Sequence, residues 1–294
     1  MSDRLTSTAN DIEYVNCPVC ETDDHVVWME DGKPTRYVRC RTCRTVYASP
    51  RLAFAKRFDW LNKTFALGPN ALTNAANRKP TLVQEAEFIQ RFISRGRILD
   101  IGCDLGDFFQ QFHGPEWQRF GVELSPSAAA YANKTYNAQV FTGTVHQATF
   151  PDAFFDLVTM IDMLYYVDDP RADLKEVSRI IKPGGLLAIE LAGQAYQLLR
   201  SRGVLCWFLD HRWTRLHTDS SYLYWFNTDG LKKLLGDCGF KVTVAHVVGS
   251  PTSSSLIRNY MARTYRTFIN VVTHMSHWWL TLAPKYLLLA QSIK

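Results

Sequence analysis

The feature that most constrains this chain is a regular alternation of short apolar segments with segments of helical periodicity, between residues 97 and 248. Short apolar runs bounded by turn residues are typical of buried strands, and spacings of three and four are typical of amphipathic helices. Strands are expected at residues 97–101, 120–124, 139–141, 155–161, 186–191, 241–248 and 285–292. Helices are expected at residues 81–94, 107–112, 126–133, 171–180 and 228–235. This order predicts a parallel sheet with helices on both faces.

Four of the seven cysteines form two close pairs near the start of the chain. Cys17 and Cys20 are separated by two residues, as are Cys40 and Cys43, and 19 residues lie between the pairs. Two such knuckles offer Zn²⁺ a tetrahedral set of thiolates, and a site filled by four protein ligands is structural. An odd number of cysteines without an export signal argues against a disulfide framework. A redox pair, which needs only one C-x-x-C, and four unrelated thiols are the alternatives.

Length and charge set further limits on the chain. A length of 294 residues suits one large domain with a small appendage. Residues 1–10 are polar and lack the apolar centre of a signal peptide, and no apolar run of about 18 residues occurs. We therefore expect a cytoplasmic protein. The net charge of +5 permits contact with phosphates or anionic lipids but predicts neither.

A loop containing two glycines follows the first strand of the alternating region, at residues 102–106. Such a turn lets a ligand approach the backbone, and the next helix offers unpaired amides. Taken alone, this loop is only weak evidence for a nucleotide-binding site. Glu123 strengthens it, because an acid at the end of the second strand, about 20 residues later, binds a ribose diol in nucleotide folds. Lys182-Pro183-Gly184-Gly185 supplies the turn expected before the fifth strand.

Together these motifs resemble class I S-adenosylmethionine-dependent methyltransferases, over about residues 80–248. Within that class the chain is similar to bacterial enzymes with an N-terminal zinc ribbon, of polysaccharide and secondary-metabolite pathways. Their phrase Cys-Arg-x-Cys-Gly-x-x-Tyr-x-x-Pro-Arg stands here at residues 40–51, and their His-Leu-Tyr-x-Phe phrase at 222–226. The resemblance implies a Rossmann-like α/β fold with a seven-stranded, mostly parallel sheet and a small N-terminal four-cysteine zinc ribbon.

The resemblance also implies S-adenosylmethionine as cofactor and a set of residues that contact it. The implied positions are Asp100, Gly102, Cys103, Asp104, Gly106, Glu123, Leu124, Thr144, Val145, Met160 and Ile161. Asp100 would orient the methionine end, Glu123 would hold both ribose hydroxyls, and Leu124 would pack on the adenine. The family usually has glycine at Asp104, but aspartate tolerates a left-handed turn better than most residues. A helix-capping Asp100 and an exposed strand end at Glu123 are the alternatives.

The residues that would face the acceptor are less defined. Methyl transfer is an in-line displacement that needs alignment and, for some oxygen and nitrogen acceptors, removal of a proton. Tyr165 and Tyr166 stand where relatives often have Glu-His, which puts a catalytic metal in doubt. These tyrosines could contact the acceptor or pack beside the sheet.

A long segment at about residues 194–227 is typical of a lid or binding loop. Within it His217 is the first candidate for a base and His211 the second, because histidine titrates near neutral pH. Tyr222 is a further candidate for acceptor contact. A surface position or a satisfied core position is the alternative for each of these side chains.

We expect three parts along the chain. They are a zinc ribbon at 1–50, a helical connector and cap at 51–95, and a methyltransferase core at 96–294 with lid insertions at about 194–227 and 250–283. Residues 257–282 are basic and aromatic and predict one or two amphipathic helices. These helices cover the sheet edge or active site, or they contact a membrane surface and a lipid-linked substrate.

Three functions are compatible with these features. The first is methylation of a small molecule, such as a sugar or secondary-metabolite intermediate. The second is an RNA methyltransferase that holds nucleic acid with the zinc module, but Ile161-Asp162-Met163-Leu164 stands where a base-binding motif such as Asn/Asp-Pro-Pro-Tyr would be, and the charge is only mildly basic. On sequence grounds, nucleic acid is therefore not the expected partner. The third is a non-catalytic zinc-ribbon interaction protein, which an intact Glu123 argues against.

Overall fold

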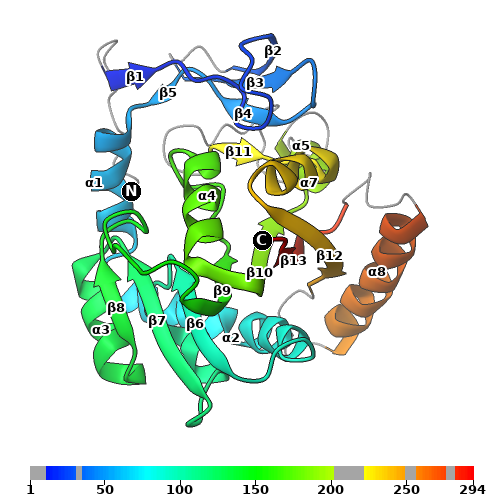
Figure 1. Cartoon of the computed structure of the whole chain (residues 1–294). Helices are drawn as coiled ribbons and strands as arrows, with labels where there is room; N and C mark the ends of the chain where they lie inside the picture. Colours follow the sequence, from blue (N-terminus) through cyan, green and yellow to red (C-terminus); the bar gives the residue numbers. More distant parts are fainter. Residues whose placement is uncertain (1–10, 31–34, 202–221, 249–255, 276–281) are drawn as a thin grey trace.

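The structure is a computed structural model that describes residues 11–30, 35–201, 222–248, 256–275 and 282–294. Its centre is a seven-stranded sheet (Figure 1). In spatial order the strands are β12 (Phe240–Val247), β13 (Lys285–Ser292), β10 (Ile181–Ala192), β9 (Phe155–Ile161), β6 (Gly96–Ile101), β7 (Trp117–Glu123) and β8 (Gln139–Thr142). β13 runs antiparallel to both neighbours, and the pairs from β10 to β8 are parallel. The predicted seven-stranded, mostly parallel sheet is confirmed.

Helices cover both faces of this sheet. The helices of the described ranges are α1 (Phe54–Thr64), α2 (Pro69–Ile89), the 3₁₀ helix η2 (Asp107–Gln111), α3 (Pro126–Tyr136), α4 (Pro170–Ile180), α5 (Gln194–Ser201), α7 (Thr228–Asp237) and α8 (Leu256–Met275). Alternate residues of a strand point to opposite faces. In β9, Val158 and Met160 therefore join the core that includes α4 and α7, whereas Leu157 and Ile161 join the core that includes α2 and η2. Burial on both faces explains why this strand is apolar throughout.

A four-stranded sheet lies above the central one in the view of Figure 1. Its order is β11 (Tyr224–Trp225), β4 (Val46–Ala48), β3 (Tyr37–Cys40) and β2 (His25–Met29). β1 (Ile12–Glu13) pairs separately with β5 (Arg51–Leu52). β11 comes from the segment expected to be a lid, yet it pairs antiparallel with β4. The N-terminal module is therefore joined to the core by sheet hydrogen bonds.

The observed elements depart from the sequence prediction in three places. The helix expected at 107–112 is a 3₁₀ helix. The Lys182–Gly185 turn is part of β10, where the pairing with β9 shifts register between Ile181 and Leu186. α2 begins at Pro69, well before the expected start at residue 81. Within the ranges described, no helix combines the length and apolar character needed to cross a bilayer.

Candidate functional site

A cavity of about 400 Å³ lies where the carboxyl ends of β6, β7 and β9 meet. Ligands of open α/β sheets bind at this edge. The remaining walls come from α1, from Arg78 of α2, from the segments after β8 and β9, and from the N-terminal end of α4. α4 begins here because Asp169 caps it, accepting hydrogen bonds from the Arg171 and Ala172 amides. The fold therefore places one concave site where the sequence predicts the cofactor.

Glu123 lies at the end of β7 on the wall of this cavity. One carboxylate oxygen accepts a hydrogen bond from the Ser125 amide at 2.8 Å, and the other accepts one from the Asp104 amide at 2.9 Å. Burial raises the pKa of Glu123 to about 7, although these amides favour the ionised form. The two bonds fix the carboxylate, and each oxygen can still accept a hydrogen bond from a ligand hydroxyl.

The turn after β6 is left-handed at two positions on the cavity. Gly102 has a φ of 74° and Asp104 a φ of 50°. A Cβ on Gly102 would lie 2.6 Å from Cγ of Met163, so only glycine fits. The expectation that Asp104 tolerates a left-handed turn is confirmed. That conformation directs its amide to Glu123, which joins the turn to the neighbouring strand.

A second cavity, of about 20 Å³, shares part of its wall with the first. Asp100 lines it, and its Oδ1 accepts a hydrogen bond from the Thr159 hydroxyl at 2.6 Å. Burial raises the pKa of Asp100 to about 7. Asp100 is thus a buried carboxyl beside the turn and not a helix cap.

Arg78 of α2 lines both cavities and was missed by sequence reasoning. Its guanidinium lies 4.0 Å from the Asp162 carboxylate. Burial opposes its charge, but the surrounding carboxylates, Asp162 and Glu190 foremost, leave its pKa raised. No sequence signal marks it, because α2 lies outside the cysteine and cofactor motifs and one arginine in a helix is not distinctive.

The structure separates the eleven predicted cofactor positions into three groups. Seven line the large cavity: Gly102, Asp104, Glu123, Leu124, Thr144, Val145 and Ile161. Asp100 and Cys103 line the small one. Met160 lines neither, which corrects its expected contact, because it alternates with Ile161 and is buried on the other face. Gly106 also lines neither; a Cβ there would lie 2.8 Å from Cβ of Ala132, so it brings η2 close to α3.

Aromatic and apolar side chains form another part of the large cavity's wall. Phe54, Leu61 and Phe65 come from α1 and its C-terminal end. Among the predicted acceptor residues, Tyr166 lines the cavity, and its ring meets Phe65 edge-on at 5.9 Å between centroids. Burial raises the pKa of Tyr166 above its ordinary value. Its phenol therefore stays protonated and can donate a hydrogen bond.

Tyr165 and Tyr222, two other predicted acceptor residues, are not on this wall. Tyr165 is buried, and its ring packs perpendicular to that of Tyr222 at 4.1 Å. Neither lines the large cavity, so packing explains both positions. His211 and His217 lie outside the described residues.

Two further polar groups lie on the wall of the large cavity. Asp162 directly follows β9, its Oδ2 lies 2.8 Å from Lys285 Nζ, and its buried Oδ1 has no hydrogen-bond partner within the described part of the chain. His146 Nε2 lies 2.9 Å from the Asp173 carboxylate. Burial raises the pKa of Asp173 to about 6, although His146 opposes this. The position of Asp162 at a strand end was the available signal.

The four predicted zinc ligands lie together. The Sγ atoms of Cys17, Cys20, Cys40 and Cys43 are all within 4.8 Å of one another. Tetrahedral thiolates at a Zn–S distance of about 2.3 Å stand about 3.8 Å apart. The two knuckles have the same backbone conformation. The residue after the second cysteine is left-handed in each, with φ of 59° at Glu21 and 62° at Arg44, and its amide donates a hydrogen bond to the carbonyl of the first cysteine. This donor set fits a closed structural zinc site.

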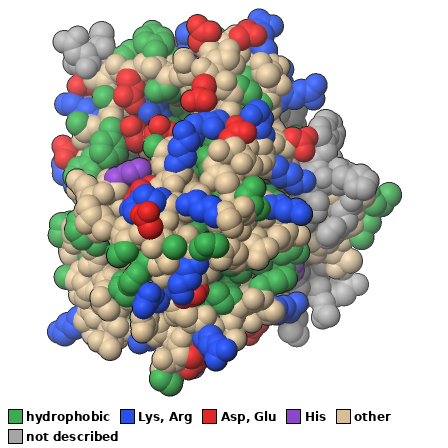
Figure 2. All heavy atoms as spheres, viewed as in Figure 1, with side chains coloured by type: hydrophobic (Ala, Val, Ile, Leu, Met, Phe, Trp, Pro, Cys, Tyr) green, Lys and Arg blue, Asp and Glu red, His purple; other side chains and the backbone are tan. Residues whose placement is uncertain are grey.

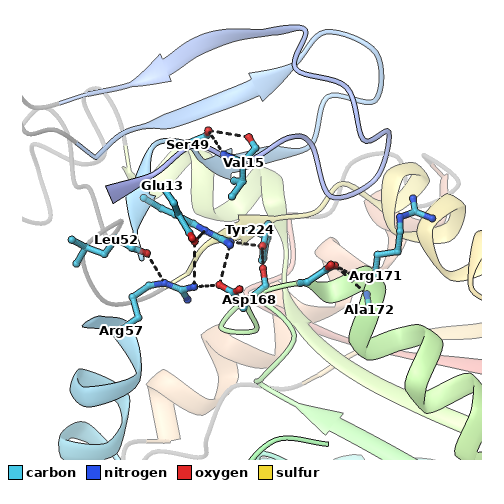
Figure 3. Close-up of polar contacts among 11 residues, drawn as sticks. Glu13, Val15, Ser49, Leu52, Arg57, Asp168, Arg171, Ala172 and Tyr224 are labelled. Carbon is cyan, nitrogen blue, oxygen red and sulfur yellow. Dashed lines mark hydrogen bonds and ion pairs between the residues drawn. The ribbon is translucent and has the colours of Figure 1, made fainter. Parts of the chain in front are cut away.

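Two buried arginines connect the N-terminal module to the large cavity (Figure 3). Arg51 donates to Glu13 at 2.7 Å and to the Tyr224 hydroxyl at 2.6 Å. Arg51, at 2.9 Å, and Arg57 both donate to the carboxylate of Asp168, which lines the cavity. The Tyr224 hydroxyl donates to the Asp168 carbonyl at 2.6 Å. The two family phrases, at 40–51 and 222–226, therefore meet at one cavity residue.

Known proteins resemble this chain over its core. A methyltransferase of Schizosaccharomyces pombe is 33% identical over 110 residues, which are 33% of this chain and 40% of that protein. The ubiquinone biosynthesis O-methyltransferase of a Bradyrhizobium species is 28% identical over 183 residues, which are 56% of this chain and 69% of that protein. The chain thus spans less than half of the fission-yeast relative.

A solved structure shows the same fold. A chain of the complex between the Haloferax volcanii Trm112 methyltransferase activator and a methyltransferase superposes with a TM-score of 0.52 and 17% identity, over 76% of this chain and 95% of that chain. A family model described as a methyltransferase domain matches residues 75–245, which is more than half of the chain. The cavity with Gly102 and Glu123 lies inside the matched region. The chain therefore belongs to this methyltransferase domain family.

Proposed function

We propose that this protein transfers a methyl group from S-adenosylmethionine to a small-molecule acceptor. The observation that carries the proposal is the large cavity, where a left-handed glycine turn faces a fixed carboxylate on the next strand. The family membership supports the same chemistry. On the face drawn in Figure 2, basic and acidic side chains are interspersed, which is unlike the basic stripe of a nucleic-acid binder.

The residues present fit S-adenosylmethionine. Glu123 would accept hydrogen bonds from both ribose hydroxyls, and Leu124 and Val145 would flank the adenine. Asp100 lies beside the turn, near the place expected for the methionine end, and Arg78 offers a guanidinium there for a carboxylate. The bound cofactor supplies the methyl group as an electrophile on its sulfonium.

The chain's own residues would position the acceptor and handle its proton. The protonated phenol of Tyr166 can donate a hydrogen bond to it. Asp162, with a buried oxygen that lacks a hydrogen-bond partner within the described ranges, can accept a proton or a hydrogen bond from the attacking group. We include His217 and His211 as further candidates for the base.

A sugar or secondary-metabolite intermediate is the acceptor class we propose. The relatives include an O-methyltransferase of Aspergillus sclerotiorum and an O-methyltransferase of ubiquinone biosynthesis from Bradyrhizobium, and the second supports a small-molecule acceptor. The aromatic wall of Phe54, Phe65 and Tyr166 supports an acceptor with a ring that can pack on it.

We further propose that the N-terminal module is a zinc ribbon that binds one structural Zn²⁺ through its four cysteines. The two C-x-x-C segments have the same backbone conformation and the same amide–carbonyl hydrogen bond, which supports this proposal. We retain the division into a ribbon at 1–50, a connector at 51–95 and a core at 96–294 as a proposal. Elemental analysis of purified protein should find about one zinc per chain, and a zinc-free folded protein would contradict it.

Calorimetry with S-adenosylhomocysteine tests the cofactor site. Glu123→Ala should weaken binding about a hundredfold, because two charge-assisted hydrogen bonds are lost. Glu116→Ala, which removes an exposed carboxylate before the other end of β7, is the matched control and should bind normally. Normal affinity of Glu123→Ala would reject the ribose assignment.

A further inference from the structure

α8 is apolar on the side that faces away from the protein. Where its side chains are described, its exposed positions are Thr264, Tyr265, Thr267, Phe268, Val271 and Met275. Four of these six are large apolar or aromatic residues, and Phe268 and Met275 are 62% and 78% exposed. The outer face of a helix on a globular protein is normally charged or polar. This exposed stripe therefore indicates a partner.

The inner side of α8 packs against the rest of the protein. Ile269 is buried in a small cluster with Val247 and Ala283. Tyr265 is 45% exposed, yet its hydroxyl donates to the Leu282 carbonyl at 3.3 Å, so it lies between the two sides of the helix. Figure 1 shows α8 at the edge of the molecule, next to β12, the edge strand of the central sheet. The helix is thus held from one side and presents the stripe outward.

All the charged side chains in this last part of the chain are basic. From Cys238 to Lys294 there are six lysines and arginines and no aspartate or glutamate. The preceding residues contain the other 27 basic residues and all 28 acidic ones, so the positive surplus of the chain comes from its last segment. Lys285 is paired inside the fold with Asp162, whereas three of the other five basic residues belong to the sequence of α8.

We propose that α8 is an interfacial helix that docks the protein on an anionic lipid bilayer through Phe268, Val271 and Met275. A helix with an apolar stripe and arginines lies in the plane of a membrane interface, and anionic lipids attract basic segments. A second copy of this chain fits less well, because a symmetric dimer would bring together two acid-free helices that contain arginine. Membrane docking is independent of methyl transfer, so either proposal can fail alone.

Vesicle flotation of the full-length protein tests this proposal. The wild type should float with vesicles of phosphatidylcholine and phosphatidylglycerol but not with phosphatidylcholine alone, and salt should weaken the binding. Phe268→Ser/Val271→Ser/Met275→Ser should bind at least about tenfold more weakly. Leu72→Ser/Phe92→Ser removes exposed apolar residues elsewhere and should float like the wild type.

A charge variant covers the case in which the triple serine variant does not fold. Arg258→Gln/Arg263→Gln/Arg266→Gln keeps the apolar stripe and should lose binding to the anionic vesicles. No flotation of the wild type, equal binding to neutral vesicles, or unchanged binding of a folded variant would each overturn the proposal. A dimer that sedimentation detects in the wild type and that the serine variant breaks would assign the stripe to a second copy instead.

Discussion

The two ends of the large cavity are built in different ways. The end at β6 and β7 consists of a turn and a carboxylate within residues 102–123, joined by backbone amides. The other end takes its wall from α1, from the segment after β9 and from arginines that hold Asp168. The first end is local in sequence, and the second is assembled from distant segments. The first should therefore be sensitive to backbone changes and the second to the loss of side-chain contacts.

The largest effect should come from the turn itself. Gly102→Ala forces a side chain into a left-handed conformation and against Met163, so affinity for S-adenosylhomocysteine should fall about a hundredfold or more. Gly236→Ala is the matched control, because a Cβ there meets nothing within 4 Å in helix α7. It should bind normally and gain about 0.5 kcal/mol of stability. Calorimetry that finds Gly102→Ala unimpaired would remove the turn from the site.

A substitution at the assembled end should lower the free energy of unfolding. Arg51→Met removes the buried cation nearest to Glu13 and one of the two that contact Asp168, while Arg57 remains; the two carboxylates are 34% and 40% exposed. Solvent screening then limits the loss to about 2 kcal/mol of unfolding free energy. Denaturant titration measures it, with exposed Arg95→Met as the control. Equal stability of the two variants would show that the arginine does not hold the two modules together.

A dependence of stability on pH is expected at the local end. Folding raises the pKa of Asp100 and Glu123 from 3.8 and 4.5 to about 7. The folded form therefore holds protons that the unfolded chain has lost, and the stability of the ligand-free protein should fall as pH rises from about 4.5 to 7.

Binding should show the opposite trend with pH. The ionised Glu123 is the better acceptor for hydroxyls, so affinity for S-adenosylhomocysteine should rise about tenfold from pH 6 to pH 8. Glu123→Gln should flatten the profile in calorimetry. A slope that survives this substitution would assign the titration to Asp100 instead.

The local end is also the part that could be predicted from the sequence. Gly102, Asp104 and Glu123 follow strand ends, and parallel strands bring their carboxyl ends to one edge. The cluster of four cysteines was also predictable, because the spacing within each short C-x-x-C segment decides its geometry. Met160 was misassigned because the motif gives a position along β9 but not the face of the strand.

The assembled end could not be predicted in this way. Arg78, Arg51 and Asp168 meet only because distant helices and strands pack together. The pairing of β11 with β4 likewise depends on tertiary contacts between residues 46–47 and 224–225. A motif search has no access to such contacts, and a side chain in a helix such as Arg78 has no local signature.

A crystal structure with bound S-adenosylhomocysteine would test the central claim most directly. We predict that both ribose hydroxyls lie within hydrogen-bonding distance of the Glu123 carboxylate, with the amino-acid end beside Gly102 and Arg78. A nucleoside bound elsewhere, or one whose ribose lies away from the end of β7, would contradict the account.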